Sequence, residues 1–341
     1  MKKRTTILTL LQISFFFSIS NSQTITLLDS GKNTSIRGLS VVSNSVAWVS
    51  GSNGYTALTD DAGKTWKWKQ LSGYEKLDFR DIEAFSDHEA IIVSAGTPAV
   101  ILKTTNGGLT WKEVYLNTSA DIFLDGMDFW NKNHGIVYGD PIKNKMQLLE
   151  TRDGGNTWKN ISNNLKIELA KGEASFAASG TTIRTGKRGH VWIATGGMQS
   201  RIFRSDDFGK TWAAYKCPIV QGNNSSGPFS LAIYNRKNMI AAGGNYLIDT
   251  LRDKNVMLSV NGGKTWIEPI SQAFGYRSAI EYISKNTVIA TGTSGTDFSS
   301  NGGQTWRRIS STSFNSLRKA KKGSLILLTG SNGKLATLNI Y

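Results

Sequence analysis

The sequence predicts an all-β fold in which seven four-stranded units form a ring, a seven-bladed β-propeller. Three observations predict it. The pattern Ser/Thr-x-Asp/Asn-x-Gly-x-Thr-Trp occurs six times in the 341 residues. The tryptophans that end successive copies are 40 to 54 residues apart, close to the length of a four-stranded blade. The last unit ends on "KLATLNI" without a fourth strand, and a segment near the N-terminus can supply one.

The first 22 residues predict a signal peptide rather than part of this ring. A basic start at residues 2–4 precedes an apolar stretch from Ile7 to Ile19 and the small residues Ser20 and Ser22. This stretch is too short and wrongly flanked for a membrane span, and no later stretch approaches 18 apolar residues. We therefore expect export to the periplasm or out of the cell, with residues 23–341 forming one domain that has no transmembrane segment.

Each unit is expected to contain four short strands, which in the first unit are "RGLSVVS", "VAWVSG", "YTALT" and "TWKWKQL". In the fourth unit, the small residues of "FAASGTT" are expected to let an inner strand pack closely. The seventh unit has three strands, and "TITLLDSG" from the N-terminus is expected to complete it, which leaves no open sheet edge. The units begin near Arg37, Arg80, Ile122, Ser175, Phe229, Arg277 and Phe314.

The six copies of the pattern, which we call the repeat turns, are expected to be structural hairpin turns between third and fourth strands. An Asp or Asn side chain accepts backbone N–H bonds within such a turn, and the Gly tolerates a positive φ. The Trp buries a large apolar face between neighbouring units. These structural roles are expected for Asp61, Asn106, Asp153, Asp207, Asn261 and Asn301, and for Trp66, Trp111, Trp158, Trp212, Trp266 and Trp306.

The composition argues against several classes of site. Cys217 is the only cysteine, and His88, His134 and His190 lie far apart, so neither a disulfide nor a metal site is expected. No dinucleotide, flavin or haem motif occurs, so no cofactor is expected. The net charge is +15, but the lysines are scattered and only "RKAKK" forms a short run. We therefore expect a monomer with a solvated basic surface and no nucleic-acid partner.

A binding site is expected at the mouth of the central channel, on the face opposite the repeat turns, where the innermost strands begin. Arg37, Arg80 and Arg277 lie 14 to 16 residues before the glycines that end their second strands, which predicts matching positions around the mouth. Asp81 and Tyr276 are their neighbours in the sequence. Three arginines could hold a carboxylate or an acidic peptide by bidentate hydrogen bonds. Alternatively, neighbouring carboxylates could neutralise them.

Three carboxylates are expected near the same mouth. Asp125, Asp140 and Glu173 could supply the acid and base of a glycoside hydrolase, although the sequence fixes no distance between them. The alternative role, which we prefer, is capping of turns or pairing with arginines.

The whole of residues 23–341 resembles exported bacterial propellers related to the photosystem II assembly-factor family. The stretches that carry the resemblance are "FLDGMDFW", "GDP", "GEASFAASGT" and "GYRSAIEY", together with the repeat turns, which are known as Asp-boxes or BNR repeats. The resemblance implies a non-enzymatic protein that binds a protein partner through an arginine patch, for which Arg37, Arg80 and Arg277 are the counterparts. The motif occurs more distantly in sialidases.

Sialidases place three arginines around a carboxylate and carry an Arg-Ile-Pro stretch near their start, for which "SIRGLSV" is a poor match. A sialidase is therefore disfavoured, whereas another carbohydrate-active enzyme stays open. The prediction is an exported, non-enzymatic binding propeller whose ligand is a protein partner or an anionic or carbohydrate ligand, with a glycoside hydrolase as the alternative.

Overall fold

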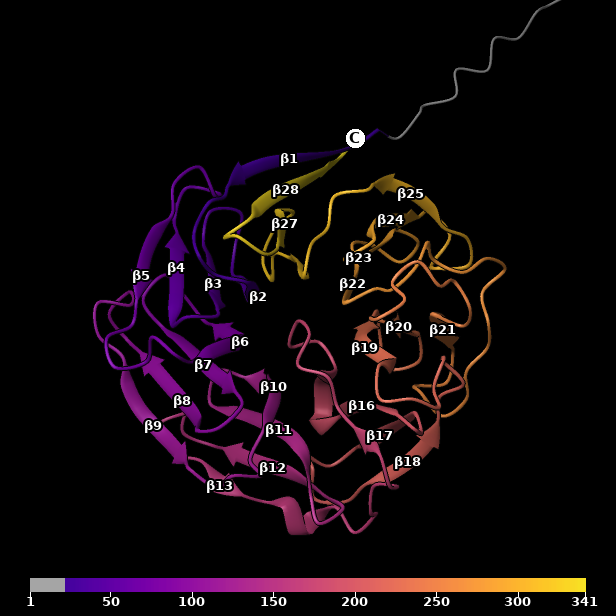
Figure 1. The fold of residues 1–341 in the computed structure, drawn as a ribbon, viewed down its shortest axis with the longest axis horizontal. Helices are drawn as coiled ribbons and strands as arrows, with labels where there is room; N and C mark the ends of the chain where they lie inside the picture. The colour runs from indigo at the N-terminus through magenta and orange to yellow at the C-terminus, as the bar shows by residue number, and fades with distance from the viewer. Residues whose placement is uncertain (1–21) are drawn as a thin grey trace, which may run out of the picture.

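The computed structural model describes residues 22–341, so the predicted signal peptide lies outside the described residues except for Ser22. Seven antiparallel sheets are arranged around a central channel, as Figure 1 shows down the axis of the ring. The predicted seven-bladed propeller is confirmed. Among residues 22–341 no helix is long and apolar enough to cross a membrane.

The first three blades each contain four strands, numbered outward from the channel. Blade 1 has β2 (Ile36–Val41), β3 (Ala47–Gly51), β4 (Tyr55–Thr59) and β5 (Lys67–Gln70), and blade 2 has β6 (Asp78–Ala84), β7 (Ala90–Ala95), β8 (Ala99–Thr104) and β9 (Lys112–Asn117). Blade 3 has β10 (Leu124–Asn131), β11 (His134–Ile142), β12 (Lys145–Thr151) and β13 (Lys159–Asn160), followed by a short 3₁₀ turn, η1 (Ser162–Asn164).

The remaining blades depart from this plan at two points, the inner strand of blade 4 and the outer strand of blade 5. Blade 4 has β14 (Glu173–Ala174), β15 (Ile183–Thr185), η2 (Lys187–Gly189), β16 (Val191–Gly197), β17 (Arg201–Ser205) and β18 (Ala213–Lys216). Blade 5 has β19 (Ser226–Ile233), β20 (Met239–Asn245) and β21 (Val256–Ser259), whose outer partner is a single bridge from Leu258 to Ile267. Blade 6 has β22 (Ala279–Tyr282), β23 (Val288–Gly292), β24 (Gly295–Ser299) and β25 (Arg307–Ser310).

The two ends of the chain close the ring in blade 7. Its strands are β26 (Ser316–Lys319), β27 (Ile326–Thr329), β28 (Leu335–Ile340) and β1 (Gln23–Asp29). β1 runs antiparallel to β28, from the pair Gln23 and Ile340 to the pair Asp29 and Leu335. Figure 1 shows the indigo β1 lying along the yellow β28 at the rim. The predicted closure by the N-terminal strand is therefore confirmed.

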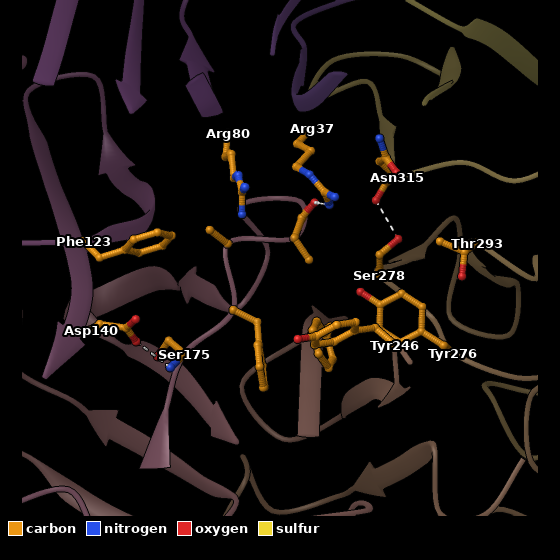
Figure 2. Close-up of a pocket in the computed structure, with 14 residues that line it drawn as sticks. Arg37, Arg80, Phe123, Asp140, Ser175, Tyr246, Tyr276, Ser278, Thr293 and Asn315 are labelled. Atoms are coloured by element: carbon orange, nitrogen blue, oxygen red, sulfur yellow. Dashed lines mark hydrogen bonds between the residues drawn. The ribbon is translucent and has the colours of Figure 1, made fainter. Parts of the chain in front are cut away.

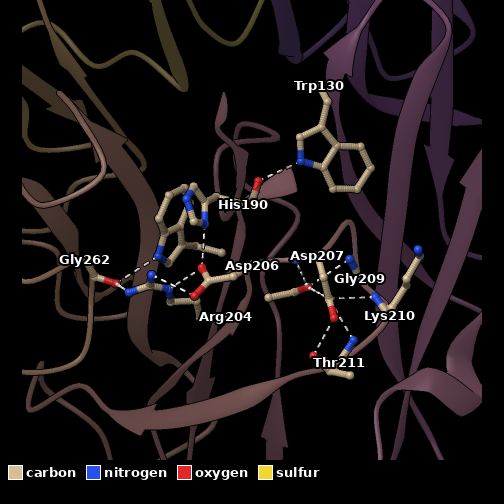
Figure 3. Close-up of polar contacts among 11 residues, drawn as sticks. Trp130, His190, Arg204, Asp206, Asp207, Gly209, Lys210, Thr211 and Gly262 are labelled. Atoms are coloured by element: carbon tan, nitrogen blue, oxygen red, sulfur yellow. Dashed lines mark hydrogen bonds and ion pairs between the residues drawn. The ribbon is translucent and has the colours of Figure 1, made fainter. Parts of the chain in front are cut away.

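The repeat turns are held together by their own side chains, as Figure 3 shows for the turn of blade 4. Asp207 accepts hydrogen bonds from the Thr211 backbone N–H at 2.9 Å and the Thr211 hydroxyl at 2.6 Å. Ser205 Oγ accepts the Gly209 N–H at 2.9 Å, and Trp212 Nε1 donates to the Gly209 carbonyl at 3.0 Å. Where Asn replaces Asp, its amide nitrogen donates to the threonine hydroxyl instead, as at Asn106.

Replacing Asp153 with alanine should destabilise the protein by roughly 1–3 kcal/mol, because hydrogen bonds to a charged carboxylate are lost. Asp153 accepts bonds from the Thr157 N–H at 3.0 Å and the Thr157 hydroxyl at 2.6 Å. Asp153→Asn should cost less, since asparagine already occupies this position in three other repeat turns. Urea unfolding of the two variants measures the difference, and equal losses would contradict this account of the turn.

The inner edge of blade 4 is interrupted by residues 175–182, which we call the channel segment. The sequence predicted an inner strand here, but these residues have irregular backbone between β14 and β15. Figure 1 shows this pink segment reaching into the centre of the ring. The prediction of a packed inner strand is wrong, and the small side chains instead let the backbone enter the channel.

The channel segment is held by hydrogen bonds from several other blades. The Ala178 carbonyl accepts from Arg37 in blade 1 at 3.1 Å, and the Ser179 carbonyl accepts from Arg318 in blade 7 at 3.1 Å. Ser179 Oγ donates to the Ser278 carbonyl at 2.7 Å, and Gly180 packs directly against the Asp81 carboxylate. Since Ala178 lines one cavity and Gly180 another, the segment separates two hollows at opposite ends of the channel.

Candidate functional site

The mouth pocket is a cavity of about 360 Å³ at one end of the channel. Residues from all seven blades line it, which is possible because the innermost strands converge there. Figure 2 shows the arginines on one side and the tyrosines across the cavity. The lining residues are Arg37, Arg80, Phe123, Asp140, Ser175, Phe176, Ala177, Ala178, Phe229, Tyr246, Tyr276, Ser278, Thr293 and Asn315.

Arg37 and Arg80 reach the pocket because each is the extra residue of a β-bulge in an innermost strand. In β2 the pairing steps from Ile36 to Gly38, and in β6 it steps from Phe79 to Asp81. A bulged residue has no partner on the neighbouring strand, and the bulge re-aims its side chain. Both arginine side chains extend side by side into the pocket in Figure 2, as the sequence predicted.

The two arginines are held close together with little neutralising charge. Arg37 Nη1 donates to the Ala178 carbonyl at 3.1 Å, and Arg80 Nε pairs with Asp78 at 2.7 Å. Burial lowers the pKa of Arg37, and the positive charge of Arg80 lowers that pKa further. The second effect shows that the two guanidinium groups repel each other across the pocket wall.

Arg277, which the sequence placed in register with these two, does not line the pocket. Its side chain is fully buried and forms an ion pair with Asp297, with Nη2 at 2.5 Å and Nε at 2.9 Å from Oδ2. Ser278 takes the inward position, since its N–H bonds the Thr291 carbonyl at the start of β22 and its side chain reaches the pocket. The prediction was in error by one residue, because counting back to a glycine ignores the bulges that β2 and β6 contain.

Tyr276 does line the pocket, as part of a cluster of aromatic rings that the sequence did not reveal. Phe229 stacks on Phe176 with their centroids 3.9 Å apart and meets the Tyr276 ring edge-to-face at 4.8 Å. Tyr246 contacts Phe229 at 6.0 Å and is 47% exposed. Burial raises the pKa of Tyr276 well above its usual value, so its hydroxyl stays protonated. A signal was present for Phe229, which begins the fifth unit as the arginines begin theirs.

The three carboxylates proposed for catalysis have different surroundings. Asp140 lines the pocket and accepts the Ser175 N–H at 2.9 Å. Asp125 is the bulge residue of β10, is 1% exposed, and neither of its oxygens has a hydrogen-bond partner among residues 22–341. Burial raises the pKa of Asp125 well above its usual value, and the charge of Asp140 adds to the effect. Burial also raises the pKa of Asp140.

Glu173 is buried away from the pocket and is already bound. Arg201 Nη2 lies 2.6 Å from its carboxylate, Thr195 Oγ1 donates at 2.5 Å, and the Ala170 N–H donates at 2.9 Å. Asp81 is also buried, and it lines the hollow at the other end of the channel. Neither carboxylate therefore faces the mouth pocket.

The structure shows no metal centre in the part of the chain it describes. No group of three or more His, Cys, Asp or Glu side chains within residues 22–341 is placed to hold a metal ion. Cys217 is buried, and burial raises the pKa of its thiol to about 12.

Comparisons with known proteins agree with this architecture. Residues 21–121 match the family model described as photosynthesis system II assembly factor YCF48. The resemblance to that family is confirmed. A search of the curated proteins found no match.

Solved structures extend the likeness over nearly the whole chain. The structure described as YCF48 bound to D1 peptide superposes with a TM-score of 0.66 at 16% identity, covering 93% of this chain and 97% of the other. YCF48 from Cyanidioschyzon merolae gives 0.66 at 15% identity, covering 92% of this chain and 98% of that one. A GH74 xyloglucanase from Xanthomonas campestris gives 0.61 at 14% identity, covering 92% of this chain and 53% of that enzyme. At these identities the likeness shows the fold.

Proposed function

We propose that this chain is a non-enzymatic binding propeller whose mouth pocket takes a carboxylate-bearing segment of a partner protein. The observation that carries the proposal is the side-by-side placement of Arg37 and Arg80 at the pocket. Each guanidinium lowers its neighbour's preference for the charged state, and only Asp78 pairs with either of them among residues 22–341. A carboxylate bound between them relieves the repulsion and accepts bidentate hydrogen bonds.

The opposite side of the pocket favours a peptide over a simple inorganic anion. Phe176, Phe229 and Tyr276 present an aromatic surface on which an apolar side chain can pack. The adjoining loop adds the exposed side chains of Leu247 and Ile248. Enrichment in aromatic residues and arginine is typical of the energetically dominant parts of protein interfaces. The YCF48 structure described with a bound D1 peptide supports a protein partner by analogy.

We also propose that the protein is exported. The proposal rests on the basic, apolar and small-residue segments of residues 1–22. Fractionation of cells that produce the full-length chain, with N-terminal sequencing of the purified protein, tests it directly.

The double variant Arg37→Gln, Arg80→Gln should lose binding of acidic peptides by about tenfold or more, because two charge-assisted contacts are removed from a partly desolvated site. The measurement is fluorescence anisotropy with labelled peptides that end in a free carboxylate or contain Asp or Glu, compared with amidated and Gln-containing versions. The control variant Lys64→Gln, Lys112→Gln loses the same charge from two exposed positions outside the pocket and should bind normally.

The same preparations should be assayed against xyloglucan and other polysaccharides, since the fold is shared with a xyloglucanase. Turnover that disappears in Asp125→Asn or Asp140→Asn would replace the binding proposal with a hydrolase. Peptide binding that is unchanged in the double arginine variant would place the partner elsewhere on the protein.

A further inference from the structure

Seven exposed cations lie on the face opposite the mouth pocket, in the loops that join the first and second strands of blades 4 to 7. Backbone hydrogen bonds from Phe208 to Gly189 and from Gly262 to Lys237 tie these loops to repeat turns, which places them on the repeat-turn face. The cations, which we call the basic arc, are Lys187, Arg188, Arg236, Lys237, Lys285, Lys321 and Lys322.

The basic arc is an asymmetric feature of the ring. None of the four loops, at 186–190, 234–238, 283–287 and 320–325, contains an Asp or a Glu. The equivalent loops of blades 1 to 3 are neutral at 42–46, contain Asp87 and Glu89 at 85–89, and hold only Lys132, which pairs with Glu89 at 2.7 Å. Cations that appear scattered in the sequence are therefore gathered on one half of one face.

A hollow of about 510 Å³ between blades 4 and 5 concentrates this charge. Lys187, Arg188 and Arg236 line it, together with Tyr234 and Asn235, and no Asp or Glu does. Within residues 22–341, none of these three cationic side chains takes part in a hydrogen bond or an ion pair. Unpaired cations facing one hollow attract an anion and discriminate against a cationic partner.

The wall beneath the hollow is rigid and its carboxylate is already engaged. Asp206 lies 2.5 Å from His190 Nδ1 and 2.8 Å from Arg204 Nε, and Arg204 Nη1 donates to the Gly262 carbonyl at 3.0 Å. Figure 3 shows Asp206 between these two partners. Trp192 also lines the hollow and donates to the Gly262 carbonyl at 2.9 Å. Asp206 is therefore not available to pair with Lys187, Arg188 or Arg236.

Tyr234 connects this hollow to a second one. Its side chain is 42% exposed and packs against Tyr282 with the ring centroids 5.5 Å apart. It lines both the 510 Å³ hollow and a neighbouring hollow of about 200 Å³ that contains Lys285 and Asn286. A chain-like ligand that crosses Tyr234 therefore meets cations on both sides of the ring.

We propose that the basic arc binds an acidic polysaccharide, a saccharide chain with repeated carboxylate or sulfate groups. The cations extend over four blades, so the ligand needs several anions in a row. The amides and the tyrosine hydroxyl suit sugar hydroxyl groups, and clustered Lys and Arg are typical of sites for heparin-like polymers. A membrane surface fits less well, because the cations face hollows. The predicted export favours a glycan over a nucleic acid. The proposal is independent of the mouth pocket.

The variant Lys187→Gln, Arg188→Gln, Arg236→Gln tests the proposal. Binding of labelled polygalacturonate and dextran sulfate at about 0.1 M salt should weaken by about tenfold or more, because surface attraction is only partly screened there. Neutral dextran should not bind to either protein. The matched control Lys64→Gln, Lys112→Gln, Lys159→Gln removes three exposed charges from blades 1 to 3 and should bind both polymers almost as the native protein does.

A second variant separates binding from folding. Arg188 has a φ of +62°, which is unfavourable for any residue with a Cβ, so Arg188→Gly should be no less stable than the native protein. It should nevertheless bind the acidic polymers more weakly. Equal weakening by both triple variants would overturn the proposal in favour of general surface charge. Arc-dependent binding of single-stranded DNA or anionic vesicles in preference to both polymers would overturn the assignment to a polysaccharide.

Discussion

Asp297→Ala should destabilise the protein by roughly 3–5 kcal/mol, because it leaves the buried Arg277 guanidinium without its counter-ion. Both side chains of this pair are 0% exposed, and Nη2 of Arg277 lies 2.5 Å from Asp297 Oδ2. Asp297 Oδ2 also accepts the Phe274 N–H at 2.7 Å. Removing the carboxylate therefore orphans a charge and a backbone donor in the interior of blade 6, and denaturant unfolding measures the loss.

Two control variants show whether the effect comes from burial. Asp60→Ala removes an exposed partner of Lys67, with side chains 46% and 62% exposed, and should cost less than about 1 kcal/mol. Asp297→Leu combined with Arg277→Met replaces the pair by apolar side chains of similar length and should recover most of the lost stability. An Asp297→Ala variant no less stable than Asp60→Ala would contradict the buried ion pair.

The stability of the protein should fall as the pH rises from about 4 to 7, with Asp81 contributing up to about 4 kcal/mol of that fall. Burial raises the pKa of Asp81 to about 7, despite the opposing charge of Arg318 and the N–H groups of Met127 and Ile82. Between the ordinary pKa of an aspartate and 7, the folded state keeps a proton that the unfolded state has released. Rising pH therefore favours unfolding in this window and has no further effect through Asp81 above it.

Asp81→Asn should flatten this profile, because it removes the titrating group while keeping its size. The exposed control Asp253→Asn should leave the profile unchanged. Urea unfolding at half-unit intervals from pH 4.5 to 8 is the measurement, and parallel curves for the native protein and Asp81→Asn would contradict the prediction.

Below pH 4 the repeat turns should dominate, with the opposite sign. Hydrogen bonds from Thr65 lower the pKa of Asp61 to about 2, and hydrogen bonds from Thr157 lower that of Asp153 to about 2 against the opposing effect of burial. Their contribution to stability is present above pH 4 and is lost as the pH falls through 2. The protein should therefore be most stable near pH 4.

The architecture was predictable because the information for it is local and repeated. Each repeat turn encodes a hairpin by itself, and the spacing of the tryptophans then fixes blade size without any long-range contact. The strand that closes the ring was predictable for a different reason, since "KLATLNI" lacked a partner and "TITLLDSG" was unassigned.

The mouth pocket was only partly predictable, because its geometry depends on shifts of a single residue. Arg37 and Arg80 project inward from bulges, whereas β22 begins without one, so Arg277 turns into the interior and Ser278 takes its place. Such shifts follow from how neighbouring strands pair, which no residue count reveals. The channel segment was missed because glycine and alanine allow close packing in a strand as well as entry of irregular backbone into a channel.

The pairing of β1 with β28 has a consequence for the order of events during synthesis. Gln23 and Ile340 are neighbours in space, so the first strand to be made must wait for the last one before it has a partner. Contacts between residues so distant in sequence form slowly, because a long loop must close before they gain any energy. A ribosome that stalls in the last blade leaves β1 unpaired and two sheet edges exposed. Such a nascent chain is open to chaperones and proteases until its final strand arrives.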